Sequence, residues 1–198
     1  MLAFSKFGFN KSAALFLASI FFTGYASAQT QTVTGSLSVS ELSAGQSTEL
    51  TVAYTATDAD GEVADTVGIG LRLHFNSSVL EMGEVANLFD DGVVGNQLKS
   101  DTDDLDGDPA TDKYYLSAWS DPFSGNWPDV DTQPITLYTV PLTAISGFNG
   151  STLNFTYSSK AAGFDFSGDS VSINKIPGTV STLSDLSGSY LIGASSTA

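Results

Sequence analysis

The amino-acid sequence predicts an all-β protein, an antiparallel β-sandwich of the jelly-roll or Greek-key kind. Hydrophobic and polar side chains alternate with a period of two in many short segments, as in strands with one buried face. Clusters of Gly, Asp, Asn, Ser and Pro separate these segments and are typical of turns. After residue 28, no window longer than about ten residues has a clear helical period. Seven or more short strands without helices between them indicate two sheets packed face to face.

The expected strands follow the alternating segments along the chain. These segments are SLSV at 36–39, ELTVAY at 49–54, GIGLRLHF at 68–75, PITLYTVPLTA at 134–144, TLNFTYS at 152–158 and SVSI at 170–173. In GIGLRLHF the apolar residues share one face, so Arg72 and His74 are expected on the opposite, solvent-facing side. We expect residues 29–176 to form the sandwich, and residues 177–198 to form one more strand or a flexible tail.

The first 28 residues have the features of a secretory signal peptide. Lys6 and Lys11 precede an apolar run, AALFLASIFF, and Ala26 and Ala28 form an A-x-A cleavage signature. The run has about half the length that a membrane-spanning helix needs. We therefore expect cleavage after Ala28 and a secreted protein, extracellular or periplasmic, without a transmembrane segment.

Composition narrows the classes of function. Cleavage after Ala28 would leave five basic and 22 acidic side chains, a net charge of −17, which argues against binding to nucleic acid. The chain has no cysteine, so disulfides, thiol catalysis and cysteine zinc sites are excluded. Because His74 is the sole histidine, a catalytic zinc site with several histidines is excluded too. No serine lies in a G-x-S-x-G motif, and the acidic residues fall mostly in turns, so an enzyme is not expected.

The stretches FNSSVLE at 75–81 and YYLSAWSD at 114–121, with others before and after them, resemble in their order cohesin modules of the carbohydrate-binding β-sandwich superfamily. The most specific is FNSSVLE at 75–81, which is similar to the turn that ends a cohesin strand. SLSVSELSAGQSTELTVAY at 36–54, YYLSAWSD at 114–121, LYTVPLTA at 137–144 and the closing segment at 151–173 are similar to further cohesin strands. The resemblance implies a cohesin-like, non-catalytic fold that binds a dockerin module or a polysaccharide. The acidic run before YYLSAW departs from the family pattern.

That acidic run, DTDDLDGDPATD at 101–112, is a candidate calcium site. Its six carboxylates are Asp101, Asp103, Asp104, Asp106, Asp108 and Asp112. Calcium takes six to eight oxygens, and a divalent ion would relieve the repulsion among these side chains. The glycine and glutamate of an EF-hand loop are not at the required positions. The alternative is a solvated loop whose Asp content favours turns. A second acidic segment, DADGEVAD at 58–65, has similar spacing.

Aromatic side chains after the acidic run are candidate ligand contacts. If Tyr114, Leu116 and Ala118 pack inward, the alternation places Tyr115 and Trp119 outside, with Trp127 on the following loop. Exposed aromatic rings stack on sugars and anchor protein interfaces. The alternative is that Trp119 is a large core residue.

These observations favour a secreted, non-catalytic binding module that recognises an extracellular protein module or a polysaccharide and is stabilised by calcium. The second class that we retain is a matrix or surface structural protein that associates with copies of itself.

Overall fold

The computed structural model describes residues 30–158 except Pro122, together with the backbone of five later segments at 160–161, 164–165, 170–175, 179–182 and 187–194. The expected signal peptide therefore lies outside the described residues. All regular elements in the described part are strands. They are β1 (Thr30–Leu37), β2 (Glu41–Leu42), β3 (Ser47–Thr57), β4 (Gly68–Phe75), β5 (Leu80–Met82), β6 (Val93–Ser100), β7 (Lys113–Ser120), β8 (Ile135–Ala144), β9 (Ser151–Tyr157), β10 (Lys160–Ala161), β11 (Phe164–Asp165), β12 (Ser170–Lys175), β13 (Thr179–Thr182) and β14 (Ser187–Ala194).

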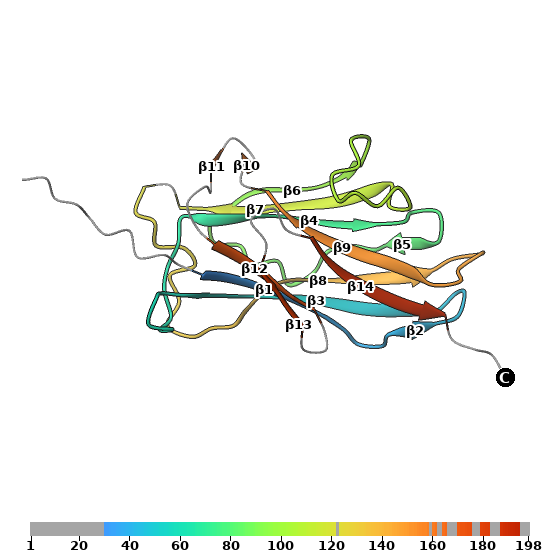
Figure 1. The fold of residues 1–198 in the computed structure, drawn as a ribbon, viewed down its shortest axis with the longest axis horizontal. Helices are drawn as coiled ribbons and strands as arrows, with labels where there is room; N and C mark the ends of the chain where they lie inside the picture. The colour runs from blue at the N-terminus through green and yellow to red at the C-terminus, as the bar shows by residue number, and fades with distance from the viewer. Residues whose placement is uncertain are drawn as a thin grey trace, which may run out of the picture.

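Two six-stranded sheets form the sandwich, as predicted (Figure 1). One sheet has the order β13-β12-β1-β3-β8-β5 and the other has the order β2-β14-β9-β4-β7-β6, while β10 and β11 form a separate two-stranded ribbon. Most neighbouring strands are antiparallel, but β1 pairs with β12, and β2 with β14, in parallel. The purely antiparallel expectation is corrected at these two places, where strands from the two ends of the chain meet.

The carboxyl-terminal residues continue the sandwich beyond residue 176. Of the two alternatives for residues 177–198, the described segments are strands: β13 pairs with β12, and β14 lies between β2 and β9.

The core lies between the sheets and follows the alternation of the sequence. On β3, Leu50, Val52 and Tyr54 are fully buried, and on β4 the residues from Ile69 to Phe75 alternate into the same cluster. Burial of such side chains stabilises the fold by about 1.5–3 kcal/mol each. Within the described part of the chain, no helix has the length and apolar character needed to cross a bilayer.

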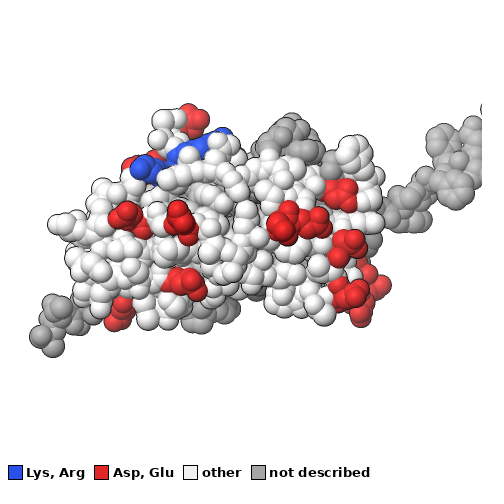
Figure 2. All heavy atoms as spheres, turned by 180° about the vertical axis from the view of Figure 1, so that it is seen from behind, with Lys and Arg blue, Asp and Glu red and all other residues white. Residues whose placement is uncertain are grey.

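The surface carries many acids and few bases. On the face drawn in Figure 2, acidic side chains are spread over the molecule and the basic ones gather at one edge. This distribution agrees with the formal net charge of −15 for the whole chain.

Candidate functional site

The acidic run forms a long loop between β6 and β7 that folds back over the outer face of a sheet. The backbone N–H of Asp101 donates to the carbonyl of Asp112, which closes the base of the loop, and the N–H of Asp112 donates to Phe75 at the end of β4. The loop then reaches β9, where Asn154 donates to the carboxylate of Asp106 at 2.7 Å. Two inner strands of the sheet, β4 and β9, are therefore covered on their outer side.

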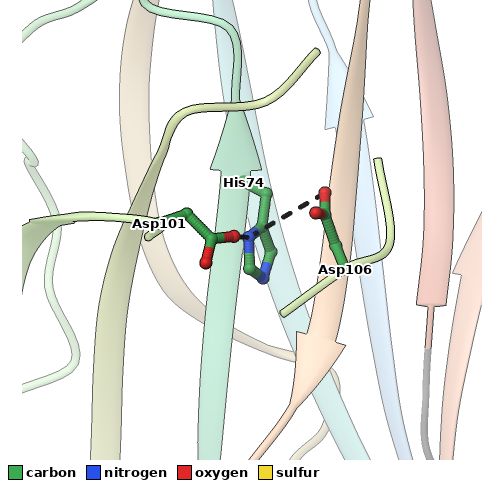
Figure 3. A group of neighbouring side chains, drawn as sticks. All are labelled: His74, Asp101 and Asp106. Carbon is green, nitrogen blue, oxygen red and sulfur yellow. Dashed lines mark hydrogen bonds and ion pairs between the residues drawn. The ribbon is translucent and has the colours of Figure 1, made fainter. Parts of the chain in front are cut away.

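His74 lies beneath this loop and is completely buried. The alternation of β4 places it opposite the core, as expected, but the expectation that it is a surface residue was wrong because the loop covers it. Its Nδ1 atom lies 2.8 Å from the Asp101 carboxylate and 3.9 Å from that of Asp106 (Figure 3). Its Nε2 atom lies 2.8 Å from the hydroxyl of Thr156 on β9.

Both carboxylates beside His74 are buried as well. The side chains of Asp101 and Asp106 have no exposed area, although their backbones reach the surface. Burial lowers the pKa of His74, since a charged imidazole loses water; Asp106 and Asp101 oppose this shift, and Arg72 adds to it.

Hydrogen bonds hold the Asp106 carboxylate. The Thr111 hydroxyl donates to both of its oxygens, at 3.0 and 2.8 Å, and Thr111 itself is only 4% exposed. Replacing Thr111 with valine keeps the shape but leaves this buried carboxylate without the donor. We expect the free energy of unfolding to fall by about 1–3 kcal/mol, measured by urea denaturation. Thr102→Val, at an exposed position of the same loop, is the matched control and should change little; equal effects of the two substitutions would refute the role of Thr111.

The structure brings together only part of the six predicted calcium ligands. Asp101 and Asp106 converge, and Asp108 joins them through Asn154, whose amide nitrogen lies 3.3 Å from the Asp108 carboxylate. Asp103 and Asp104 are exposed. The loop therefore does not bring all six carboxylates together at one metal centre.

Asp112 also has a different role from the one expected. Its carboxylate accepts the backbone N–H and the hydroxyl of Ser77, both at 2.6 Å. Burial alone would raise the pKa of Asp112, but these hydrogen bonds outweigh it and hold the pKa below its usual value. This contact fixes the end of the loop to the turn after β4.

The second acidic segment is held as a turn. The Asp58 carboxylate accepts the backbone N–H groups of Asp60 and Glu62, at 2.9 and 3.0 Å. In the described part of the chain, the group of His, Asp and Glu side chains whose ligand atoms lie within 4.8 Å of one another is His74, Asp101 and Asp106.

The three predicted aromatic contacts are not an exposed platform. Tyr115, Trp119 and Trp127 are 6%, 0% and 1% exposed and belong to the core. The reason is the strand register: Trp119 pairs with Ile69, and cross-strand partners point to the same face of a sheet. The alternative reading of Trp119 as a core residue is confirmed.

The loop between β7 and β8 nevertheless forms a pocket at the surface. It has a volume of about 520 Å³, and its lining includes Trp127, the acids Asp91, Asp121 and Asp129, and Phe123. Phe123 is 98% exposed. We call these five residues the Phe123 pocket. Trp127 was predicted as a ligand contact from the sequence, but Phe123 was not. The segment FSGNWPD at 123–129, which begins with Phe123, has only the composition of a turn.

Comparisons with known proteins give likenesses at the level of structure only. No family model matches the chain, and no curated protein matches it. Among solved structures, a type II cohesin domain from the cellulosome of Acetivibrio cellulolyticus is 12% identical, with a TM-score of 0.47, over 82% of this chain and 95% of that one.

Two further solved structures have similar coverage. The seventh ScaB type I cohesin of Pseudobacteroides cellulosolvens is 10% identical, with a TM-score of 0.43, over 85% of this chain and 94% of that one. A type I cohesin–dockerin complex from Clostridium thermocellum contains a chain that is 12% identical, with a TM-score of 0.38, over 85% of this chain and 95% of that one. Cohesin modules are thus what the chain is similar to in structure. With TM-scores below 0.5, this likeness assigns neither a family nor a partner to the chain.

Proposed function

We propose that the chain is a non-catalytic binding module that acts outside the cytoplasm and recognises a protein partner through the Phe123 pocket. The observation that carries this proposal is the exposure of Phe123, which is 98% accessible and lines a pocket together with Trp127 and three acidic side chains. Large aromatic side chains in such positions anchor protein interfaces.

The rim of the pocket suits a partner with basic side chains. Asp91, Asp121 and Asp129 line the pocket together with the aromatic side chains of Phe123 and Trp127. A lysine or arginine can lay its methylene groups on the exposed Phe123 ring while its charge meets the carboxylates. The negative charge of the whole chain would speed the approach of such a partner.

The loop that carries Phe123 is held by Asp121. The Asp121 carboxylate accepts the backbone N–H groups of Phe123 and Ser124, both at 3.2 Å, and the Ser124 hydroxyl. These hydrogen bonds lower the pKa of Asp121, and those from Ser124 have the largest effect. A loop that is ordered before binding loses less conformational entropy when the partner docks.

A protein partner is favoured over a polysaccharide because of where the aromatic rings lie. Sugar-binding sheets present flat aromatic faces to solvent, whereas Tyr115, Trp119 and Trp127 are buried. The exposed aromatic ring beside the pocket, that of Phe123, stands on a turn with acids around it.

The proposal is tested by retaining extracellular proteins of the source organism on the immobilised chain and measuring the affinity of the purified partner by calorimetry. We expect Phe123→Ala to weaken binding by tenfold or more, since such anchors contribute about 2 kcal/mol or more. Val39→Ala removes an apolar side chain that is 48% exposed and lies outside the pocket, and this variant should bind normally.

Three outcomes would contradict the proposal. They are retention on cellulose or chitin that Phe123→Ala leaves unchanged, sedimentation as an oligomer of the chain alone, and equal partner affinity of the Phe123→Ala and Val39→Ala variants. The first would indicate a polysaccharide ligand and the second a self-assembling structural protein.

A further inference from the structure

The polar cluster under the β6–β7 loop has an imbalance of charge that the fold itself does not resolve. Two buried carboxylates, Asp101 and Asp106, face one imidazole. The nearby Arg72 guanidinium is directed elsewhere, to the Ser158 hydroxyl at 2.8 Å and over the Tyr114 ring. Buried charges in proteins are paired or bind metal ions, because an unpaired charge loses its hydration without compensation. This cluster therefore lacks positive charge.

A second observation at the same place is independent of the acids. Asn154 is 4% exposed, and among the described residues its Oδ1 atom has no hydrogen-bond partner. The amide lies at the cluster, because its nitrogen donates to Asp106 at 2.7 Å and contacts Asp108 at 3.3 Å. A buried acceptor without a partner is rare in folded proteins and requires an explanation. In the structure the amide nitrogen faces the carboxylates. If the amide turned by 180° about its last torsion angle, the oxygen would take the place of the nitrogen, and a cation between the oxygen and the carboxylates would satisfy both.

We propose that His74, Asp101 and Asp106, with the amide oxygen of Asn154, form a site for one divalent cation. The ion is one that accepts nitrogen as well as oxygen ligands, such as Zn²⁺. This site is independent of the Phe123 pocket. It differs from the calcium site expected from the sequence in using two of the six aspartates and a histidine.

The spacing of the donor atoms supports a small ion. Four ligands at about 2.1 Å in a tetrahedral arrangement lie roughly 3.4 Å from one another. The Nδ1 atom of His74 is 2.8 Å from the Asp101 carboxylate and 3.9 Å from the Asp106 carboxylate. The first distance would have to lengthen and the second to shorten by about half an ångström to reach the tetrahedral spacing. Calcium takes six to eight oxygens at longer distances, and imidazole suits zinc and related ions.

Neighbouring groups would orient the ligands. The Thr156 hydroxyl, 2.8 Å from Nε2, can accept the proton of that nitrogen and leave Nδ1 free to bind metal. The N–H of Leu105 donates to Asp101, and Thr111 donates to Asp106. The ion would join the loop to β4 and β9, so that binding stabilises the fold.

The test uses the full chain after removal of metal with a chelator. We expect ZnCl₂ to bind with one ion per chain by calorimetry and to raise the melting temperature by about 5–10 °C at about 100 times the dissociation constant. CaCl₂ and MgCl₂ at millimolar concentration should give little shift. Asp101→Asn should abolish the zinc-dependent shift, whereas Asp103→Asn, exposed in the same loop, should retain it.

A spectroscopic measurement does not depend on the folding of any variant. Co²⁺ added to the metal-free chain should give visible absorption bands of the strength typical of four-coordinate cobalt, which zinc then removes. A melting temperature that responds to calcium but not to zinc would overturn the proposal. So would the absence of any metal-dependent shift, which would leave the cluster as a set of hydrogen bonds between His74 and its neighbours. A zinc shift that survives Asp101→Asn would overturn it as well.

Discussion

Replacing Trp119 with alanine is expected to lower the free energy of unfolding by about 3–5 kcal/mol. The indole is fully buried and stacks on Trp127 with ring centres 6.0 Å apart. Its Nε1–H donates to the carbonyl of Phe89 at 2.7 Å, so the substitution leaves a cavity and also a carbonyl without its donor. For a domain of this size the melting temperature should fall by about 6–20 °C.

Urea denaturation followed by circular dichroism measures this effect without relying on the tryptophan signal that the substitution removes. The control is Phe123→Ala, which deletes an aromatic side chain that is 98% exposed and should change the stability by less than about 0.5 kcal/mol. If both variants unfold at the same urea concentration, Trp119 is not the core residue described here.

Replacing Gly68 with alanine should be similarly damaging, for a reason that lies in the backbone. Gly68 begins β4 with a φ of +128°, a backbone conformation that residues with a side chain rarely adopt. A Cβ atom there would overlap the Trp119 carbonyl oxygen and lie 2.7 Å from the Ser120 Cα atom. Because Gly68 pairs with Ser120 in the sheet, the two strands would have to separate. We expect a loss of about 3 kcal/mol or more, seen as a lower melting temperature or failure to fold.

Gly45→Ala separates the two causes of that loss. Gly45 also has a positive φ, +87°, but nothing lies within 4 Å of a Cβ atom built on it. Its substitution should cost only the strain of the backbone, about 1–2 kcal/mol. A Gly68→Ala variant no less stable than Gly45→Ala would show that β7 does not pack against β4 as described.

The strands with strict alternation could be predicted from the sequence. Which face of β7 enters the core could not be predicted. On β4, small and polar residues alternate with large apolar ones, so one face alone can enter the core. On β7 both faces carry apolar residues. Tyr115 and Trp119 enter the main core, while Leu116 and Ala118 form a second small cluster on the other side. Only pairing with β4 distinguishes the two faces, and pairing is a contact between distant segments.

The candidate metal site could be predicted only in part from the sequence, because it too depends on contacts between distant segments. The run of aspartates is visible in the sequence and includes Asp101 and Asp106. His74 was missed because it alternates outward, which ordinarily means exposure. The outward polar residues Asn154 and Thr156 on the neighbouring strand, near a long acidic loop, were the available signal.

The sequence by itself determined the all-strand character, the separation of apolar from polar faces on β3 and β4, and the acidic charge, because these depend on composition and on neighbours two residues apart. The tertiary structure decided that Tyr115, Trp119 and Trp127 lie inside and that the acidic loop covers a histidine. Those outcomes depend on contacts across long separations, 27 residues from His74 to Asp101 and 82 from His74 to Thr156, which alternation cannot report.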